Sequence, residues 1–226
     1  MRLALAALVI LGASEAYAYR PFEGTDADTA GFHEVELEFG PLQLTHFRGD
    51  TDYTPNFVFN YGFARGFELV VDLDGTFLHG SHTVGSDVVV KGLIRGGSLH
   101  GGHGPSIALE TGVLFPTLPR DSSDAGWVAD LIVSQRWTPL TLHLNLTSGY
   151  DRDRSIIRQA SLIAEGPEGW RVRPVAEVLV DPDRGYILGG AIWQAKESLA
   201  VDAAVVGERM DGATGVEVRL GVTAVL

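Results

Sequence analysis

Residues 215–226 read G-V-E-V-R-L-G-V-T-A-V-L. Apolar side chains at positions 216, 218, 220, 222, 224 and 226 alternate with Glu217, Arg219, Gly221 and Thr223. Residues two apart share one face of a β-strand, whereas on a helix they point in different directions. The alternation therefore predicts a strand with one apolar and one polar face.

The same period of two recurs upstream, for example in residues 67–77 and 140–147. Along the whole chain the pattern predicts twelve strands, and a count of ten with other boundaries stays open. The expected strands begin near Glu34, Asn56, Phe67, Asp87, Ser106, Trp127, Leu140, Ile156, Trp170, Gly185, Leu199 and Gly215.

The N-terminus has the features of an export signal. Arg2 gives a positive region, residues 3–13 form an apolar core, and Ala16 and Ala18 precede an expected cut. We therefore expect a signal peptide over 1-18, a flexible N-terminal segment of low hydrophobicity over 19-33, and a β-barrel over 34-226. Segment 19-33 can hang in the periplasm or fold into the lumen as a plug, and the sequence allows both.

After the signal, no stretch approaches the ~20 consecutive apolar residues that a membrane-spanning helix needs. The connections near Arg65 and Pro139 are short, whereas those at 50–55, 116–125 and 149–154 are longer. This asymmetry is typical of outer-membrane barrels with an even strand count, whose termini both face the periplasm. We predict an all-β fold, a single antiparallel up-and-down transmembrane β-barrel in the bacterial outer membrane. A soluble lipocalin-like barrel or sandwich is the alternative.

Composition excludes several classes of function. The chain has 226 residues, with 17 Lys plus Arg against 29 Asp plus Glu, a net charge of −12 and no Cys. So acidic a chain offers few cations to phosphates, which excludes nucleic acid as a partner. The absence of Cys excludes disulfides and thiolate metal sites. The expected partners are outer-membrane lipid, the barrel-insertion machinery and a small-molecule solute that the sequence does not identify.

Two N-terminal stretches carry a family resemblance. Residues 20–28 read R-P-F-E-G-T-D-A-D, and residues 34–40 read E-V-E-L-E-F-G. Together they resemble the opening of the outer-membrane transporter family named after the meta-pathway of phenol degradation. The resemblance implies a small outer-membrane barrel with a role in the uptake of organic compounds. Leu226 departs from the aromatic residue that ends many outer-membrane barrels.

Ser134 and His143 are the residues that could form a hydrolytic site. Both lie on the polar faces of neighbouring expected strands, where a serine and a histidine can meet. The chain has no G-x-S-x-G elbow, and a histidine among polar lumen residues is more often a hydrogen-bonded lining residue. We therefore predict no catalytic residues, no cofactor and no enzymatic activity.

Two H-x-x-H pairs, His79 with His82 and His100 with His103, have the spacing of metal ligands. They flank one expected strand from Asp87 to Arg95, and nine residues at about 3.3 Å each separate them by about 30 Å. The pairs should lie at opposite sides of the membrane, so we predict no metal site. The Gly- and His-rich stretch 96–104 is long for a periplasmic turn.

Charged residues at polar-face positions are the candidates to line the lumen. They are Glu34, Glu36, Glu38, Glu68, Asp72, Asp74, Lys91, Arg95, Glu110, Arg136, His143, Arg171, Arg173, Glu177, Glu217 and Arg219. Acids on the early strands should form one arc of the wall, and bases from later strands another. The sequence thus favours a passive channel or transporter for small solutes. The alternative is a closed structural or binding barrel with a salt-bridged interior.

Overall fold

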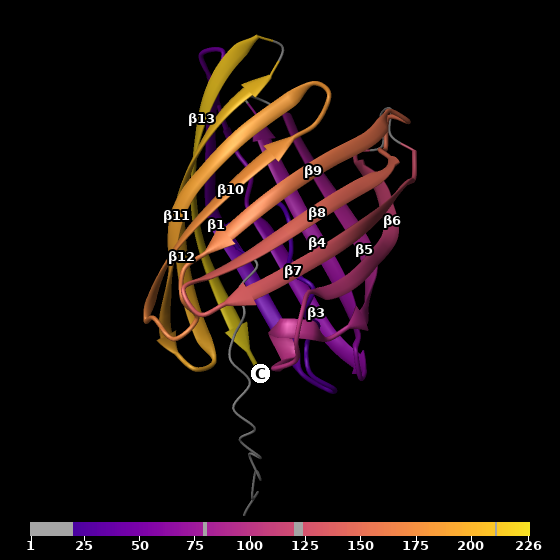
Figure 1. The fold of residues 1–226 in the computed structure, drawn as a ribbon. Helices are drawn as coiled ribbons and strands as arrows, with labels where there is room; N and C mark the ends of the chain where they lie inside the picture. The colour runs from indigo at the N-terminus through magenta and orange to yellow at the C-terminus, as the bar shows by residue number, and fades with distance from the viewer. Residues whose placement is uncertain (1–19, 79–80, 120–123, 211) are drawn as a thin grey trace, which may run out of the picture.

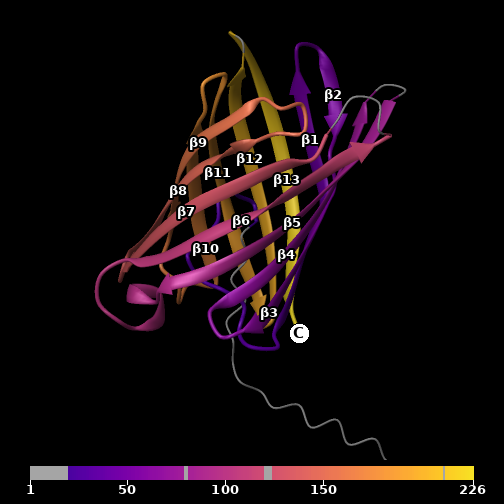
Figure 2. The same cartoon turned by 90° about the vertical axis from the view of Figure 1, so that its right-hand side faces the viewer.

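A computed structural model describes residues 20–78, 81–119, 124–210 and 212–226. Over these residues the chain forms a barrel of strands with a segment inside it (Figures 1 and 2). The end of the barrel near the C-terminus is called the lower end here, and the opposite end the upper end. The expected signal peptide, residues 1–18, lies outside the described residues.

The strands follow one another around the barrel in chain order. They are β1 (Val35–Phe47), β2 (Asp50–Tyr53), β3 (Asn56–Ala64), β4 (Phe67–Leu78), β5 (Ser81–Arg95), β6 (Ser106–Leu118), β7 (Gly126–Trp137), β8 (Leu140–Tyr150), β9 (Ile156–Glu165), β10 (Val172–Val180), β11 (Arg184–Lys196), β12 (Leu199–Met210) and β13 (Ala213–Val225). The short β2 and the longer β3 run along the same neighbour, β1, so together they make one position in the wall.

The barrel closes because β13 pairs antiparallel with β1, from Glu36 opposite Val225 to Phe47 opposite Gly215. All other neighbours also pair antiparallel. Closure gives every described strand position of the wall a paired neighbour on both sides. The prediction of a single up-and-down barrel of twelve strands is confirmed, and a ten-stranded arrangement does not occur.

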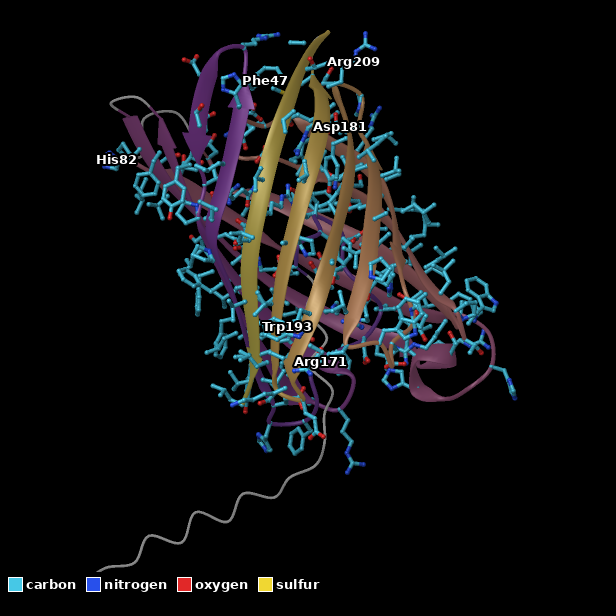
Figure 3. All side chains as sticks on the ribbon, turned by 90° about the vertical axis from the view of Figure 1, so that its left-hand side faces the viewer. Phe47, His82, Arg171, Asp181, Trp193 and Arg209 are labelled. Carbon is cyan, nitrogen blue, oxygen red and sulfur yellow. The ribbon has the colours of Figure 1, made fainter. Side chains whose placement is uncertain are left out.

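The apolar faces of the strands point outward. Leu146, Ile187 and Val205 are 46%, 65% and 54% exposed, whereas Glu217 and Arg219 point inward and are buried. A surface of this kind needs an apolar medium around it, as lipid provides. Side chains such as Trp193 stand on the outer surface near the lower end (Figure 3). A soluble barrel, which would place these side chains inward, does not fit this arrangement.

Some strand boundaries differ from the sequence prediction. β5 begins at Ser81 rather than near Asp87, and β10 begins at Val172 rather than near Trp170. Residues 96–104, which fitted a periplasmic turn poorly, contain the short 3-10 helix η1 (Gly97–His100) at the lower end. Leu99 of η1 is buried with an apolar cluster, which explains why so long a connection is ordered. Among the described residues, no helix is long and apolar enough to cross a membrane.

Candidate functional site

Residues 20–33, called the plug segment here, form no strand; residues 20–30 lie inside the barrel, and residues 31–33 are exposed before β1 begins. The sequence allowed a periplasmic or a lumenal position, and the structure has the lumenal one. Along the segment, hydrogen bonds lead to β10, then β8, then β7, and finally to β4. The segment therefore crosses the lumen before the chain enters β1.

Glu177 of β10 holds the middle of the plug segment. Its carboxylate accepts the backbone N–H of Glu23 at 3.0 Å and that of Gly24 at 2.9 Å. It also accepts the hydroxyl of Tyr186 at 2.5 Å. Three donors offset the cost of burying a carboxylate that is 1% exposed.

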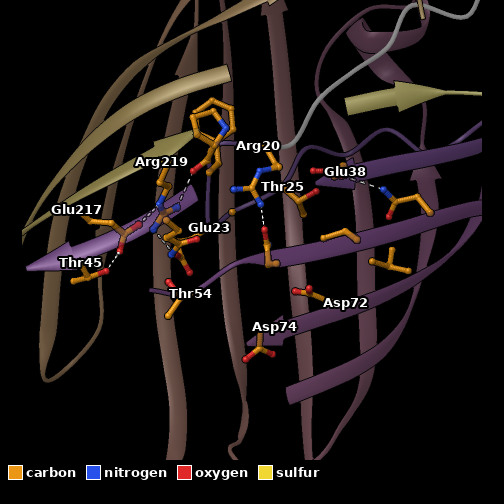
Figure 4. Close-up of a pocket in the computed structure, with 18 of the residues that line it drawn as sticks. Arg20, Glu23, Thr25, Glu38, Thr45, Thr54, Asp72, Asp74, Glu217 and Arg219 are labelled. Carbon is orange, nitrogen blue, oxygen red and sulfur yellow. Dashed lines mark hydrogen bonds and ion pairs between the residues drawn. The ribbon is translucent and has the colours of Figure 1, made fainter. Parts of the chain in front are cut away.

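Arg219 of β13 makes a second anchor. It donates to the carbonyl of Pro21 at 2.7 Å and to Glu23 at 2.6 Å. It also donates to Glu217, which accepts the hydroxyl of Thr45 at 2.8 Å (Figure 4). An arginine has five N–H donors in a fixed fork, which allows one side chain to join β13 to two points of the segment.

The lower part of the segment is bonded through its backbone. Thr25 and Asn145 exchange two hydrogen bonds of 2.9 Å, in which each residue donates once. The N–H of Ala27 donates to Ser134 at 2.9 Å, and the N–H of Ala30 donates to Glu68 at 2.6 Å. Polar wall residues thus pair with backbone groups that would otherwise be buried without partners.

A cavity of about 540 Å³ lies between the plug segment and the upper end of the barrel. Residues 20–25 line it, together with inward side chains of β1 and β3–β6 and of β11–β13 (Figure 4). Eight acids and four bases line this cavity. They are Glu23, Glu38, Glu68, Asp72, Asp74, Glu110, Glu208 and Glu217, and Arg20, Lys91, Arg184 and Arg219. The lining is therefore acidic in balance.

The structure separates the sequence-predicted lumen residues into three groups. Those on the cavity wall are Glu38, Glu68, Asp72, Asp74, Lys91, Glu110, Glu217 and Arg219. Those buried in the interior outside the cavity are Glu36, His143, Arg173 and Glu177. Those near the lower end are Glu34, Arg95, Arg136 and Arg171.

The lower-end residues are less enclosed than a lumen position implies. Arg95 and Arg171 are exposed; Arg95 donates to the carbonyl of His103 at 2.9 Å, and the Arg171 guanidinium lies 5.9 Å from the Trp193 ring. Arg171 precedes β10 instead of belonging to it (Figure 3). Both residues lie at a strand end, where the alternation of inward and outward side chains no longer determines which way the side chain points.

The bases do not form an arc opposite the acids. Lys91 stands in register between Glu68 and Glu110, within the acidic side of the wall. Arg173 pairs with Glu165 at 3.4 Å.

The wall from β10 to β12 is instead largely apolar, with a buried cluster against which Phe22 packs. The members of this cluster are Val175, Leu179, Tyr186, Leu188, Ile192, Ala200, Ala204 and Val206. Lys91 and Arg173 therefore lie beside acids of neighbouring strands and not across the lumen from them.

Ser134 and His143 do meet, with 2.8 Å between the serine hydroxyl and Nδ1 of the ring. His143 Nε2 lies 3.4 Å from Glu165. Ser134 is fully buried, however, and its oxygen accepts the N–H of Ala27. Neither residue lines the cavity, and the pair is bonded to the plug segment through the N–H of Ala27.

The described histidines of the two H-x-x-H pairs are far apart. His82 lies at the upper end of β5, whereas His100 and His103 follow its lower end. His79 lies outside the described residues. His100 forms an ion pair of 3.1 Å with Asp28 of the plug segment. In the part of the chain that the structure describes, no three His, Asp or Glu side chains are grouped as a metal site.

Sequence reasoning missed several interior residues. Arg20 and Glu23 lie in a segment without periodicity, so nothing local indicates where they point. Asp202 is inward and 1% exposed, but its neighbours on that face, Ala200 and Ala204, are apolar. The alternation that found Glu217 and Arg219 was absent there.

A closed barrel of twelve antiparallel strand positions, apolar outside and polar over much of its interior, has the fold of a small porin. Three solved structures agree with this class. The KdgM porin matches with a TM-score of 0.60 and 11% identity over 84% of this chain and 98% of that chain. The KdgM porin in complex with disordered oligogalacturonate matches with a TM-score of 0.62 and 11% identity, over the same shares of the two chains.

The NanC porin gives a TM-score of 0.57 and 9% identity, over 83% of this chain and 98% of that chain. No protein-family model and no curated protein matches this chain. At this level of identity the likeness concerns the fold.

Proposed function

We propose that the protein is a passive channel of the bacterial outer membrane for small solutes, and that the plug segment closes it. One observation carries this proposal: a closed polar barrel holds a cavity of about 540 Å³ that ends at a segment outside the sheet. Because the plug segment belongs to no strand, it can move while the wall stays paired. Cavities of this size suit small-molecule ligands.

The acidic balance of the cavity supports a neutral or cationic solute over an anionic one. Charged rings at a constriction select ions of the opposite sign. The resemblance to the phenol meta-pathway family supports organic compounds as the solute class. In this respect the channel would differ from KdgM, whose complex holds oligogalacturonate, a chain of sugar acids.

The second candidate function is a closed binding or structural barrel. The plug segment favours it because its bonds reach β4, β7, β8, β10 and β13, which is a broad attachment. Each bond contributes about 0.5–1.5 kcal/mol net, so the set together can hold the segment in place. Conductance separates the two functions.

The test compares the full chain with a variant lacking residues 20–32 in planar lipid bilayers. Folding of both is checked first by the heat-dependent gel mobility of closed barrels. We expect brief, infrequent steps from the full chain and long-lived discrete steps from the variant. If the folded variant gives no steps, the channel is wrong and the closed barrel is favoured.

A further inference from the structure

Two inward-facing glycines make a recess in the wall where β13 meets β1. Gly221 and Gly40 are both buried, on neighbouring strands. A Cβ on Gly40 would overlap the guanidinium of Arg20, and a Cβ on Gly221 would overlap both Arg20 Nε and the carboxylate of Asp202. The missing side chains therefore create the space that the guanidinium fills.

Polar groups surround this recess at one level of the barrel. Asp202 pairs in register with Gly221, Gly40 with Asn56, and Asn56 with Asp74. Arg20 donates a hydrogen bond to the side-chain oxygen of Asn56. The recess thus has Asp202 on one side, Asp74 on the other and the amide oxygen of Asn56 between them.

Arg20 does not satisfy the acids that surround it. Asp202, Glu38 and Asp72 are the acids whose charges act on it, and Asp202 is 1% exposed. Neither oxygen of Asp202 has a hydrogen-bond partner among the described residues, and neither has the Nε of Arg20. A buried carboxylate to which no other residue donates is costly, so Asp202 points to a cation that can reach it better than the tethered Arg20 does.

We propose that this recess is a binding site for a solute that carries a guanidinium group, and that Arg20 is its intramolecular occupant. A planar guanidinium fits between two glycines and can donate two parallel hydrogen bonds to one carboxylate. A free solute can turn toward Asp202, whereas Arg20 is held by the backbone of the plug segment. As a solute class for the channel this assignment rests on the proposed function, while binding itself can be measured without conductance.

Binding at this site acts on the plug segment. Arg20, Asn56 and Asp72 line the cavity, so the site is reached from the upper end once Arg20 withdraws. The solute and Arg20 compete for one space. A bound solute molecule therefore favours the arrangement in which Arg20, at the start of the plug segment, has left the recess.

Isothermal titration calorimetry of the full chain in detergent micelles, with agmatine as the probe, tests the site. Arg20→Ala removes the occupant, and we expect it to bind agmatine at least about tenfold more tightly than the unchanged protein, which corresponds to one charge-assisted hydrogen bond. Arg209→Ala, which removes an exposed arginine of β12, is the matched control and should leave the affinity unchanged.

A second substitution tests the recess itself. The three nearest atoms to a Cβ at Gly40 all belong to Arg20, so Gly40→Ala fits once Arg20→Ala is present. The double variant should bind agmatine at least about tenfold more weakly than Arg20→Ala, because the methyl group occupies the recess. Equal binding by the two variants would overturn the proposal, and so would tight binding of butylamine, which has no guanidinium.

If Arg20→Ala fails to fold, Arg20→Gln removes the charge while keeping a side-chain amide, and the same tenfold gain is expected. A folded variant of either kind that does not bind agmatine contradicts the site. Agmatine binding by a barrel that never conducts contradicts the channel and leaves the site standing. Conductance without agmatine binding contradicts the site alone.

Discussion

Glu177 is an ionisable group in the apolar part of the wall, between Val175 and Leu179 on the inner face of β10. Its burial is tolerated because Glu23, Gly24 and Tyr186 all donate to it. The same bonds attach the plug segment to the side of the lumen that has few other polar groups. Glu177 is therefore one of several anchors of the segment, and the one on this apolar side of the lumen.

Glu177→Gln should destabilise the barrel by about 1–3 kcal/mol. The NH2 group of the glutamine would point at an N–H or O–H group that donates to the carboxylate, so that hydrogen bond would be lost. Urea unfolding in lipid vesicles measures the change. Glu197→Gln, in the exposed turn between β11 and β12, is the control and should stay within about 0.5 kcal/mol. An unchanged unfolding midpoint for Glu177→Gln would show that the segment does not depend on these bonds.

At the scale of the element, the outward side chains of one strand lie at different depths in the membrane. Leu162 and Ile156 lie on the outer face of β9 and are 48% and 53% exposed. Ile156 begins the strand at its upper end, whereas Leu162 lies six residues further along the strand, away from that end. Because the two side chains are about equally exposed, a difference in the cost of placing a charge at the two positions reports their depth in the membrane.

Leu162→Arg should destabilise the barrel by about 2–4 kcal/mol, and Ile156→Arg by about 0–1 kcal/mol, since the cost of a charge falls toward the interface. Unfolding in bilayers measures both. Equal costs at the two positions would contradict the placement of β9 across the membrane.

The sequence predicts the elements where one face is polar. In β8 and β13 the alternation gives both the strand and its polar face, and Glu217 and Arg219 on that face of β13 are buried. In β11, Ile187 and Leu188 are consecutive, so they place apolar side chains on both faces of the strand. The alternation therefore does not indicate which face of β11 points into the barrel. The inner apolar wall was therefore not predicted.

The plug segment could not be placed from sequence for a different reason. Several of its contacts join residues more than a hundred positions apart, such as Glu23 with Glu177 and Thr25 with Asn145. No local pattern encodes such pairs, since they depend on how the closed wall arranges its side chains. The recess at Gly40 and Gly221 was missed in the same way, because it exists only where two distant strands meet.

At the scale of the whole molecule, the barrel has a direction in the membrane. β1 begins and β13 ends at its lower end, and its upper end carries the loop at Asp153. In an outer-membrane barrel with an even strand count, the start of the first strand and the end of the last strand are expected to face the periplasm. The cavity would then open toward the exterior of the cell.

Asp153→Cys should react with a membrane-impermeant maleimide on intact cells, whereas Arg65→Cys should react only after the outer membrane is permeabilised. Both residues are exposed and the chain has no other Cys, so labelling reports the side of the membrane. The reverse pattern would invert the orientation and place the cavity toward the periplasm.

The central claim is that movement of the plug segment opens the lumen, and a reversible lock tests it most directly. An ideal Cβ on Gly24 lies in contact with Ser161 Oγ, so cysteines at 24 and 161 place two sulfurs within reach of each other. Bilayer recordings of Gly24→Cys/Ser161→Cys should show discrete steps after reduction and lose them after oxidation. Steps that persist through complete oxidation, or that never occur in the reduced protein, would contradict the account.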